Sequence, residues 1–525
     1  MPADNPADEP GVSEDVAAAG LPSPEEVICV LRKPASAGYV YEVIALEQEE
    51  RDGRPSFSLR RFSWARKDDD DDDKDVALQR LIDDFGIHDP PVHLQPGPQR
   101  RVHVLVSTHS GTRLSLPFYN DVLAPLLGAI GLTASGKGQQ EPESEIAEQQ
   151  SSYQLLITQD AGSVSNFARD LAGQIRREKS VEHTVVLLSG DGGVVDILNS
   201  YASAEDDPTA SSHAAAAPQN LPLIAVLPLG TGNALFHSLH KTVKAPMAAS
   251  DLVQGLRTLL RGHAAPLPSF KAAFPEGSRT IAYSETANDF AATGDETSSP
   301  DLKEKAEYVA HLYGAVVASY GFHSQLVWES DTPAYRQHGA KRFQMVAQEL
   351  LKESHAYRAT VEIVRSTTGG GVVGSERLDQ DRHAYILATP VSNLEKTFCI
   401  SPASRPLDGQ LHLVHFGPVD GAKMMEIMMA VYDGGKHVAM RWGGTTAQGE
   451  DKDEDGDEVA DGDGVGYEAI SEVRITTHEE DARWRKVCID GTIVEIPTGG
   501  CMVVSKETRR HLRILVDESI RLPIN

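Results

Sequence analysis

The pattern of apolar and polar positions changes twice along the chain, and its middle part is the most regular. There, short and nearly continuous apolar runs alternate with longer segments whose apolar residues recur at helical spacing. In chain order they predict strand 102–106, helix 116–128, strand 153–158, helix 164–177 and strand 184–188. Strands that are apolar on both faces are typical of a parallel sheet covered by helices on both sides. We therefore predict an α/β domain over residues 99–262.

The residues before this domain follow a different pattern. Three short β-rich runs between residues 27 and 62 are separated by Gly and Pro, which predicts a small β-rich N-terminal module over residues 25–98. The aspartate run from Asp68 to Asp73 is expected to be a solvated acidic loop of that module. Residues 1–24 are rich in Pro, Ala, Asp and Glu, a composition that predicts a disordered tail.

After residue 262 the chain becomes rich in β-type segments. They lie at 270–274, 356–364, 383–388, 410–415 and 487–496. We predict a second, mostly antiparallel β domain over residues 263–525, because no regular strand and helix alternation continues there. An acidic stretch at 450–464 is expected to be a solvated insertion between two strands.

Composition and charge narrow the class of protein. The 525 residues carry 49 basic and 77 acidic side chains, a formal net charge of −28, which repels nucleic-acid phosphates and anionic lipid surfaces. A non-specific nucleic-acid binder is therefore not expected. The four cysteines form no C-x-x-C pair, which favours a reducing compartment. Because the start lacks the pattern of a signal peptide and no run of about 18 apolar residues occurs, we expect a cytoplasmic protein.

Two glycine-rich turns carry the candidate chemistry. Each follows an apolar strand and precedes a helix: the first spans 189–193 and the second 229–233. In a parallel sheet such turns lie at the carboxyl ends of the strands, where backbone N–H groups favour phosphate. One such turn alone is as typical of a tight structural turn as of a phosphate site. Two of them, with Asp191 held among glycines, favour a nucleotide site.

These residues resemble a known family. The segments Ser189-Gly190-Asp191-Gly192 and 228–235 (Pro-Leu-Gly-Thr-Gly-Asn-Ala-Leu) are similar to the nucleotide motifs of the lipid kinases related to diacylglycerol kinase, most closely the sphingosine (long-chain-base) kinases. The resemblance extends over residues 101–505. Its further matches are Gly321-Phe322, Glu329-Ser330, Tyr335-Arg336, Gly339, Arg342-Phe343 and Asp490-Gly491.

The resemblance implies a fold, an activity and a set of site residues. The implied fold is an α/β nucleotide-binding domain followed by an antiparallel β-sandwich that helps to hold lipid. The implied reaction transfers the ATP γ-phosphoryl group to a lipid hydroxyl with Mg²⁺, and Asp191 would activate the acceptor or help to hold the metal. The residues implied to line ATP are Ser107, Thr108, His109, Ser110, Gly111, Thr112, Thr158, Ser189, Gly190, Gly192, Gly193, Gly230, Thr231, Gly232, Asn233, Arg336, Arg342, Asp490, Gly491 and Thr492.

The chain departs from the family pattern at three places. Ser107 stands where the family has Asn, and Thr492 stands where the late Asp-Gly-Glu turn has Glu. Glu495 is a poor substitute for that Glu, because strand alternation would point it to the opposite face. At the lipid site Gln325 and Val327 replace the two aspartates of the sphingosine kinases, so the anion that would meet a sphingoid ammonium is missing.

These departures leave several functions open. A sphingoid base is the first expected substrate and diacylglycerol the second, because a neutral lipid needs no carboxylate partner. The enzyme would work in the cytosol with transient, peripheral membrane association. NAD kinase has a similar Gly-Asp-Gly motif, but the segment with Arg336 and Arg342 argues against an NAD kinase. A catalytically weak pseudokinase that binds lipid or nucleotide is a further alternative, motivated by Ser107 and Thr492. The presence of Asp191, Arg336 and Arg342 argues against it, because a dead site has no chemical need for them.

Overall fold

The computed structural model describes residues 20–35, 38–51, 53–65, 73–108, 110–135, 152–205, 220–241, 249–283, 304–339, 341–366, 374–442 and 463–520. Four sequence expectations fall wholly or mostly outside these ranges. They concern His109, the tail over residues 1–19, the aspartate run up to residue 72, and residues 450–462 of the acidic insertion.

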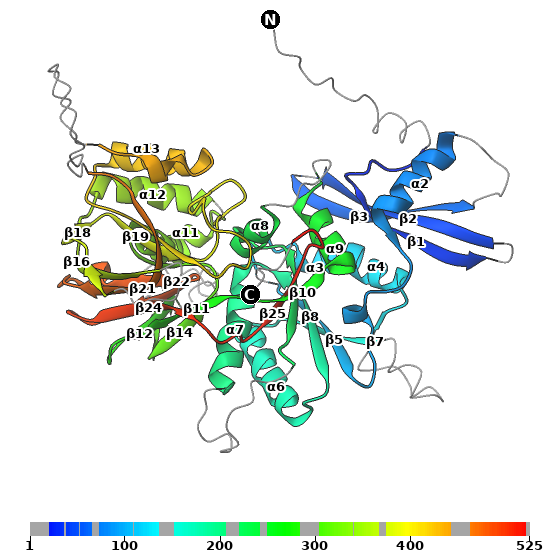
Figure 1. Ribbon diagram of the computed structural model, residues 1–525, viewed down its shortest axis with the longest axis horizontal. Coiled ribbons are helices and arrows are strands. Elements are labelled where there is room, and N and C mark those ends of the chain that lie inside the picture. The colour runs from blue at the N-terminus through cyan, green and yellow to red at the C-terminus, as the bar shows by residue number, and fades with distance from the viewer. Residues whose placement is uncertain are drawn as a thin grey trace, which may run out of the picture.

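The middle of the molecule is a seven-stranded sheet in the order β10-β25-β9-β8-β5-β7-β6 (Figure 1). Its strands are β5 (Arg100–Val106), β6 (Thr133–Ala134), β7 (Ser152–Ile157), β8 (Glu182–Ser189), β9 (Leu223–Pro228), β10 (His263–Pro266) and β25 (Arg513–Val516). All neighbours are parallel except β10 and β25, which are antiparallel. The α/β prediction is confirmed.

Helices cover both faces of this sheet because its strands are apolar on both faces. Val185 and Leu187 of β8 pack with α6 (Ser163–Arg177) and α7 (Asp191–Glu205), whereas Val186 and Leu188 pack on the other side. The second layer consists of α3 (Ser115–Phe118), the π-helical turn η2 (Tyr119–Leu123), α4 (Ala124–Ala129) and α9 (Asp251–Arg261). The short helix α8 (Ala234–His240) follows β9.

The predicted domain boundary at residue 262 does not coincide with the edge of this sheet. Strand β10 lies just beyond the boundary, and β25 returns from near the end of the chain to pair with β9. The apolar run of β25 has the same local pattern as the strands of the second domain. Only the tertiary pairing assigns it to the first sheet.

The second domain is a fourteen-stranded sheet in which every neighbouring pair is antiparallel. Its strands are β11 (Ser269–Ala273), β12 (Arg279–Tyr283), β13 (Glu304–Tyr308), β14 (His311–Gly314), β15 (Ala318–Gly321), β16 (Tyr357–Arg365), β17 (Glu376–Arg377), β18 (Arg382–His383), β19 (Tyr385–Thr389), β20 (Leu411–Phe416), β21 (Gly466–Thr477), β22 (Lys486–Ile489), β23 (Thr492–Glu495) and β24 (Cys501–Glu507). Hydrogen bonds link them all in one sheet around a shared core. The antiparallel prediction is confirmed, and the sandwich arrangement stays a prediction.

Helices lie against this sheet on the side that Figure 1 shows at the upper left. They are α10 (Phe322–Ser330), α11 (Pro333–Arg336), α12 (Lys341–Glu353) and α13 (Gly421–Tyr432), with short 3-10 turns η5 (Lys436–Ala439) and η6 (Ala482–Trp484). The described part of the chain contains no helix that is long and apolar enough to cross a bilayer. The four cysteines, which all lie in described ranges, carry free thiols.

The N-terminal module is a four-stranded sheet in the order β3-β2-β1-β4, with one helix. Its elements are β1 (Val27–Ala35), β2 (Gly38–Arg51), β3 (Arg54–Ala65), α2 (Asp73–Phe85) and β4 (Gly86–Ile87), followed by η1 (Val92–Leu94). The sequence interpretation missed α2, although Ala77, Leu78, Leu81 and Phe85 form its buried face. Leu21, assigned to the tail, is also buried in this cluster.

Arg257 of α9 makes several of the polar contacts that dock the module on the α/β domain. Arg257 donates from Nε to the Val27 carbonyl at 2.9 Å and from Nη2 to the carbonyls of Pro24 and Val27 at 2.5 and 2.7 Å. Its guanidinium also lies 4.3 Å from the centre of the Phe85 ring. A single side chain therefore joins the α/β domain to both layers of the module.

We expect Arg257→Ala to destabilise the protein by about 1–3 kcal/mol, because it leaves carbonyl groups at the interface without their donor. Urea unfolding followed by circular dichroism measures this change. Arg382→Ala, at an exposed arginine of β18, is the matched control and should lie within about 0.5 kcal/mol of wild type. Equal stability of the two variants would contradict a docking role.

Candidate nucleotide site

Four loops meet at one edge of the seven-stranded sheet. They follow β5, β7, β8 and β9, which are neighbours in the sheet and run parallel, so their carboxyl ends lie together. These loops contain the residues 107–112, Thr158, 189–193 and 229–233 that the sequence assigned to one site. The structure brings all four together, with His109 outside the described residues.

Three glycines allow the loops to pack backbone against backbone. A Cβ added to Gly230 would lie 2.3 Å from the Cα of Gly190, and one added to Gly111 would lie 2.7 Å from the carbonyl carbon of Gly230. No side chain fits at these contacts. A Cβ on Gly192, in the first turn of α7, would meet nothing within 4 Å. The loops are therefore closely packed against one another but open towards Gly192.

Hydrogen bonds fix the loops in this arrangement. The backbone N–H of Gly190 donates to Ser110 Oγ at 3.1 Å, and that of Leu229 donates to the carbonyl of Ser189 at 3.2 Å. The N–H of Thr108 donates to Thr158 Oγ1 at 3.0 Å, while Thr108 Oγ1 donates to the Thr158 carbonyl at 3.0 Å. The hydroxyls of Thr108 and Ser110, which follow Ser107, therefore serve the loop structure.

Asn233 closes the second glycine turn on itself. Its backbone is left-handed, with φ 52°, a conformation that Asn tolerates better than most residues. Its Oδ1 accepts from the N–H of Gly230 at 2.9 Å, and its Nδ2 donates to the Gly230 carbonyl at 3.1 Å. The side chain thus substitutes for a backbone partner and holds the turn at the start of α8.

Asp191 binds the start of α8 from the neighbouring turn. Its Oδ2 accepts from the N–H of Ala234 at 2.8 Å and its Oδ1 from the N–H of Leu235 at 2.9 Å. A carboxylate at a helix N-terminus is favourable, because the first N–H groups have no partner within the helix. Burial raises the pKa of Asp191, while these two hydrogen bonds lower it in part. The acid predicted to be catalytic therefore also links β8 to α8.

Asp490 makes a similar contact from the second domain. It occupies the two-residue turn between β22 and β23 with Gly491, and their φ values of 48° and 91° are those of a tight hairpin. Its carboxylate accepts from three successive N–H groups, those of residues 315–317, at 2.5–3.2 Å. Such a row of N–H groups forms an anion-binding concavity. Here the protein fills it with its own carboxylate.

The two acids lie close to each other across the domain interface. Burial raises the pKa of Asp490 to about 7, and the charge of Asp191 contributes to the rise. Leu235 and Ala315, whose N–H groups the two acids bind, line the same small cavity between the domains. The late Asp-Gly turn therefore lies near the glycine turns, and its part in a nucleotide site stays a prediction.

Two features of the site bear on the binding of a phosphate and of a metal ion. The open side at Gly192 lets a phosphate approach the backbone at the N-terminus of α7, where N–H groups favour anions. Magnesium is typically held by one or two carboxylates together with substrate phosphates and water. Asp191 and Asp490 are two carboxylates in this region. Within the described ranges, however, no cluster of three or more His, Cys, Asp or Glu exists that could hold a metal ion without a bound substrate.

The two predicted arginines share one acidic partner in the second domain. Arg336, at the end of α11, binds Asp331 through Nε at 3.1 Å and Nη2 at 2.7 Å. Arg342, in the first turn of α12, lies 3.6 Å from the same carboxylate. Burial lowers the pKa of Arg342, which the charge of Asp331 partly offsets. These contacts are the ion pairs expected of arginines with a structural role.

The predicted lipid residues lie on α10 and are engaged in the protein interior. Gln325 is 1% exposed and donates from Nε2 to Glu329 Oε1 at 2.7 Å. The same Glu329 oxygen accepts from Arg483 at 2.8–3.0 Å. Val327 packs beside Trp328 in a small apolar cluster with β12, β22 and β23. In this conformation neither side chain presents a polar group to a lipid headgroup.

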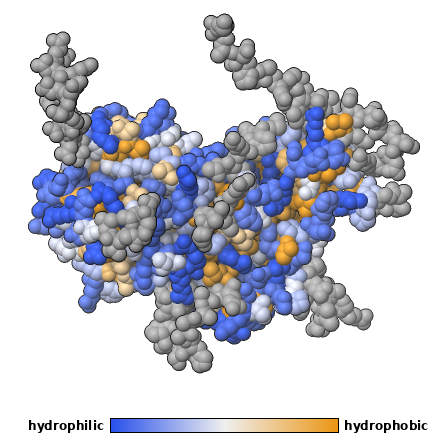
Figure 2. Space-filling model, in the orientation of Figure 1, coloured by the Kyte–Doolittle hydropathy of each residue, from blue (hydrophilic) through white to orange (hydrophobic). Residues whose placement is uncertain are grey.

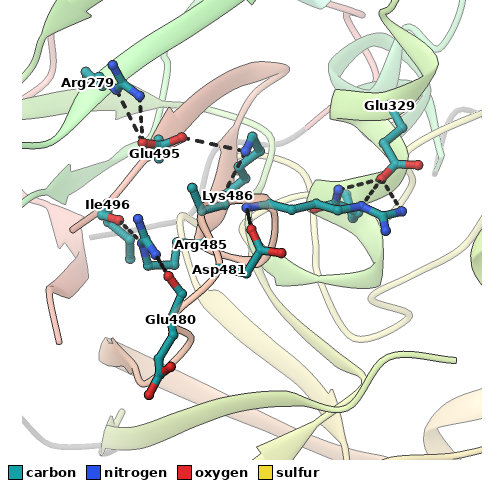
Figure 3. Close-up of polar contacts among 11 residues, drawn as sticks. Arg279, Glu329, Glu480, Asp481, Arg485, Lys486, Glu495 and Ile496 are labelled. Carbon is teal, nitrogen blue, oxygen red and sulfur yellow. Dashed lines mark hydrogen bonds and ion pairs between the residues drawn. The ribbon is translucent and has the colours of Figure 1, made fainter. Parts of the chain in front are cut away.

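Glu495 is held away from the Asp490 turn by cross-strand ion pairs (Figure 3). It binds Arg279 of β12 at 2.9 Å and Lys486 of β22 at 3.6 Å. Lys486 and Arg279 are its direct partners in the register of the neighbouring strands. Glu495 therefore does not replace the carboxylate that is absent at Thr492, as strand alternation predicted.

Sequence reasoning missed a residue that fixes α7 against the second domain. Asn199 donates from Nδ2 to the carbonyl of Tyr313 at 2.8 Å and accepts from the N–H of Tyr313 at 2.8 Å. Asparagine has no preference for the interior of a helix, and this was the available signal. Asn199 and Asp490 together fasten β14 and the following residues 315–317 beside the glycine turns.

One segment of the chain matches a known protein family. Residues 131–264 match the diacylglycerol kinase catalytic domain. The match includes both glycine turns and Asp191, and it supports a lipid kinase in general. No curated protein matches the chain.

Solved structures show distant similarity in fold. A diacylglycerol kinase from Bacillus anthracis str. Sterne is 11% identical, with a TM-score of 0.40, over 80% of this chain and 98% of that chain. A second structure, described as a "putative diacylglycerol kinase" from the same organism, is 13% identical, with a TM-score of 0.43 and the same coverage.

We expect Gly230→Ala to destabilise the kinase-like site, because the new methyl group would overlap the backbone of Gly190. Overpacking of this kind typically costs about 1–3 kcal/mol. Gly192→Ala is the control: its methyl group meets open space, so its melting temperature should equal or slightly exceed that of wild type. Thermal melting of the three proteins checks this. Equal loss of stability in both variants would contradict the close contact of the turns.

The pKa of Asp490 predicts a pH dependence of stability. Its pKa is raised from 3.8 to about 7 in the folded protein, so folding favours the protonated acid. This contribution is fully present below about pH 4 and is lost as the pH rises through about 7. Asp490→Asn cannot lose a proton. We therefore expect the melting temperature of wild type to fall, relative to Asp490→Asn, between those two pH values.

Thermal melts of both proteins across that range measure the effect. Asp170→Asn, at an exposed position of α6, should keep the wild-type profile. Parallel profiles for wild type and Asp490→Asn would show that Asp490 is already ionised throughout the range.

Proposed function

We propose that the chain is an ATP- and Mg²⁺-dependent lipid kinase that transfers the γ-phosphoryl group to a lipid hydroxyl. The observation that carries the proposal is the backbone contact of the two glycine turns with each other and with Gly111 next to Asp191, with open space beside Gly192. Phosphoryl transfer needs mainly the positioning of the two substrates and the neutralisation of charge on the phosphate oxygens. Backbone N–H groups, and a metal ion held by nearby carboxylates, would provide both. The match of residues 131–264 to a lipid kinase domain supports it.

The proposal gives each part of the site a role. The turns at 107–112, 189–193 and 229–233 line the nucleotide, and Asp191 and Asp490 would hold Mg²⁺, which neutralises phosphate charge when bound. Asp191 additionally orients or deprotonates the acceptor hydroxyl. Arg336 and Arg342 bind phosphate oxygens after exchanging Asp331 for the nucleotide, since a guanidinium fork suits both anions.

We propose two candidate lipid acceptors, in order of preference. The resemblance to long-chain-base kinases supports a sphingoid base as acceptor. Diacylglycerol is the second candidate, and a specific contact favours it: Glu329, the acid nearest to Gln325 on α10, is already paired with Arg483. A sphingoid ammonium would have to displace that arginine, whereas a neutral lipid would not. Transient membrane association follows from either substrate.

A non-catalytic regulator is the candidate from a different class. The sequence argument against it is that a dead site has no chemical need for Asp191, Arg336 and Arg342. The structure weakens this argument, because Asp191 binds two N–H groups of α8 and so has a structural use. Such a protein would bind nucleotide or lipid without turnover.

Radiolabelled ATP with a panel of lipids tests these alternatives. The purified chain is incubated with Mg²⁺ and a sphingoid base, ceramide, diacylglycerol or NAD, and the labelled product is identified. Label on a sphingoid base or on diacylglycerol selects the substrate. Nucleotide binding without label on any acceptor would favour the regulator, and label on NAD would overturn the lipid kinase.

We expect Asp191→Asn to lower kcat by at least ~10²-fold, the scale of a lost general base. The matched control is Asp196→Asn on the same helix, where burial raises the pKa of the acid to about 6. A thermal melt confirms that each variant is folded. Undiminished lipid phosphorylation by folded Asp191→Asn, or an equal loss of kcat in both variants, would contradict the catalytic role of Asp191.

A further inference from the structure

The outer face of α13 is an exposed apolar surface. Met425, Met429 and Tyr432 are 43%, 59% and 45% exposed, and Met345 of the neighbouring α12 is 37% exposed. They are four of the eight large apolar side chains exposed in the described part of the chain. The opposite side of α13 is buried through Met424, Ile427 and Val431. Figure 2 shows orange and pale residues gathered over this region at the upper left.

Charge is balanced on this face, although the whole protein is strongly acidic. The only charged residues of α13, Lys423 and Glu426, pair with each other at 2.5 Å. Just beyond the helix, Lys436 pairs with Asp433 at 2.7 Å, and on α12 Lys352 pairs with Glu349 at 3.0 Å. The formal net charge of −28 would hold most of the surface away from an anionic bilayer. Among the described residues of α12 and α13, this pairing leaves no large excess of negative charge, and the Tyr432 hydroxyl donates to one further acid, Glu395, at 3.5 Å.

The interior beneath the face is apolar as well. A small crevice there is lined mainly by apolar side chains, such as Met424 of α13, Leu350 of α12 and Phe322 at the start of α10, together with Glu353, Ser354 and His355. Helix α10 also carries Gln325, the position that the family resemblance assigns to lipid. Apolar side chains therefore continue from the exposed methionines to Phe322, at the start of the helix that carries Gln325. A protein partner would need no such continuation, whereas a lipid surface that supplies substrate would.

We propose that the exposed face of α13, defined by Met425, Met429 and Tyr432, docks on the surface of a zwitterionic lipid bilayer. The inference rests on the proposed function only to explain why the protein would bind a bilayer. Binding to the bilayer can itself be measured without turnover. Methionine side chains are unbranched and flexible, so they adapt to the irregular acyl and headgroup boundary. Tyrosine suits the same depth because its ring is apolar and its hydroxyl is polar.

The test is cosedimentation of the full chain with phosphatidylcholine vesicles, compared with the double variant Met425→Glu/Met429→Glu. We expect binding to fall at least about tenfold, because two charged side chains would replace two that enter the interface. Met425→Leu/Met429→Leu should retain binding. Val76→Glu/Val92→Glu adds the same charges at exposed apolar positions of α2 and η1 and should bind like wild type.

Replacing about 30% of the lipid with phosphatidylserine should weaken binding, since the protein is acidic. Stronger binding to that mixture, or equal binding by all variants, would overturn the proposal. Light scattering is the second measurement: a dimer of the wild type that Met425→Glu/Met429→Glu dissolves would assign the face to a second copy of the chain instead.

A kinase assay separates this inference from the proposed function. With lipid supplied in detergent micelles, Met425→Glu/Met429→Glu should match wild type, and with lipid in vesicles it should be slower. If wild type phosphorylates no lipid in either form, the proposed function fails while sedimentation still decides the docking face. Equal rates of wild type and variant on vesicles would contradict docking through α13.

Discussion

The contact of Gly190 with Gly230 is the constraint on which the rest of the site depends. Two turns that belong to adjacent parallel strands meet there without an intervening side chain. Because the turns are so close, the carboxylate of Asp191 reaches the first N–H groups of α8, and the N–H of Leu229 reaches the Ser189 carbonyl. A bulkier turn would separate β8 from α8 and leave those donors without partners.

The second domain is joined to this site by polar contacts to main-chain atoms. Asp490 binds three consecutive N–H groups, and Asn199 binds both polar groups of one residue in β14. Such bonds fix position and direction more strictly than apolar packing, which tolerates sliding. The buried apolar core that α7 shares with the second domain supplies the contact area between the domains. The side chains of Asp490 and Asn199 fix how the two domains are aligned.

The two acids of the site combine structural and chemical possibilities. A carboxylate has about four acceptor positions, so Asp191 retains capacity after binding two N–H groups. Burial raises the pKa of Asp490 and the charge of Asp191 adds to the rise, while its hydrogen bonds to residues 315–317 lower it in part. Asp490 therefore fixes the domain interface through its N–H partners, whereas Asp191 keeps acceptor positions free.

Local patterns in the sequence determined the strands, the order of the domains and the position of the glycine turns. Val185 to Leu188 specify a strand buried on both faces wherever they fold, and Asp490-Gly491 specifies a tight hairpin by its backbone preferences alone. Such features depend on neighbouring residues, so a single chain suffices to find them. The helix α2 was within reach of the same reasoning, because its buried residues recur at helical spacing.

Only the tertiary structure decided where the polar side chains find their partners. Asp191 binds N–H groups 43 and 44 residues away, and Asp490 binds N–H groups 173 to 175 residues away. Strand β25 joins β9 from the far end of the chain, and Gln325 is occupied by an acid that Arg483 also binds. Nothing local distinguishes these partners, because backbone N–H groups are alike in every residue and only the packed domains bring particular ones within reach.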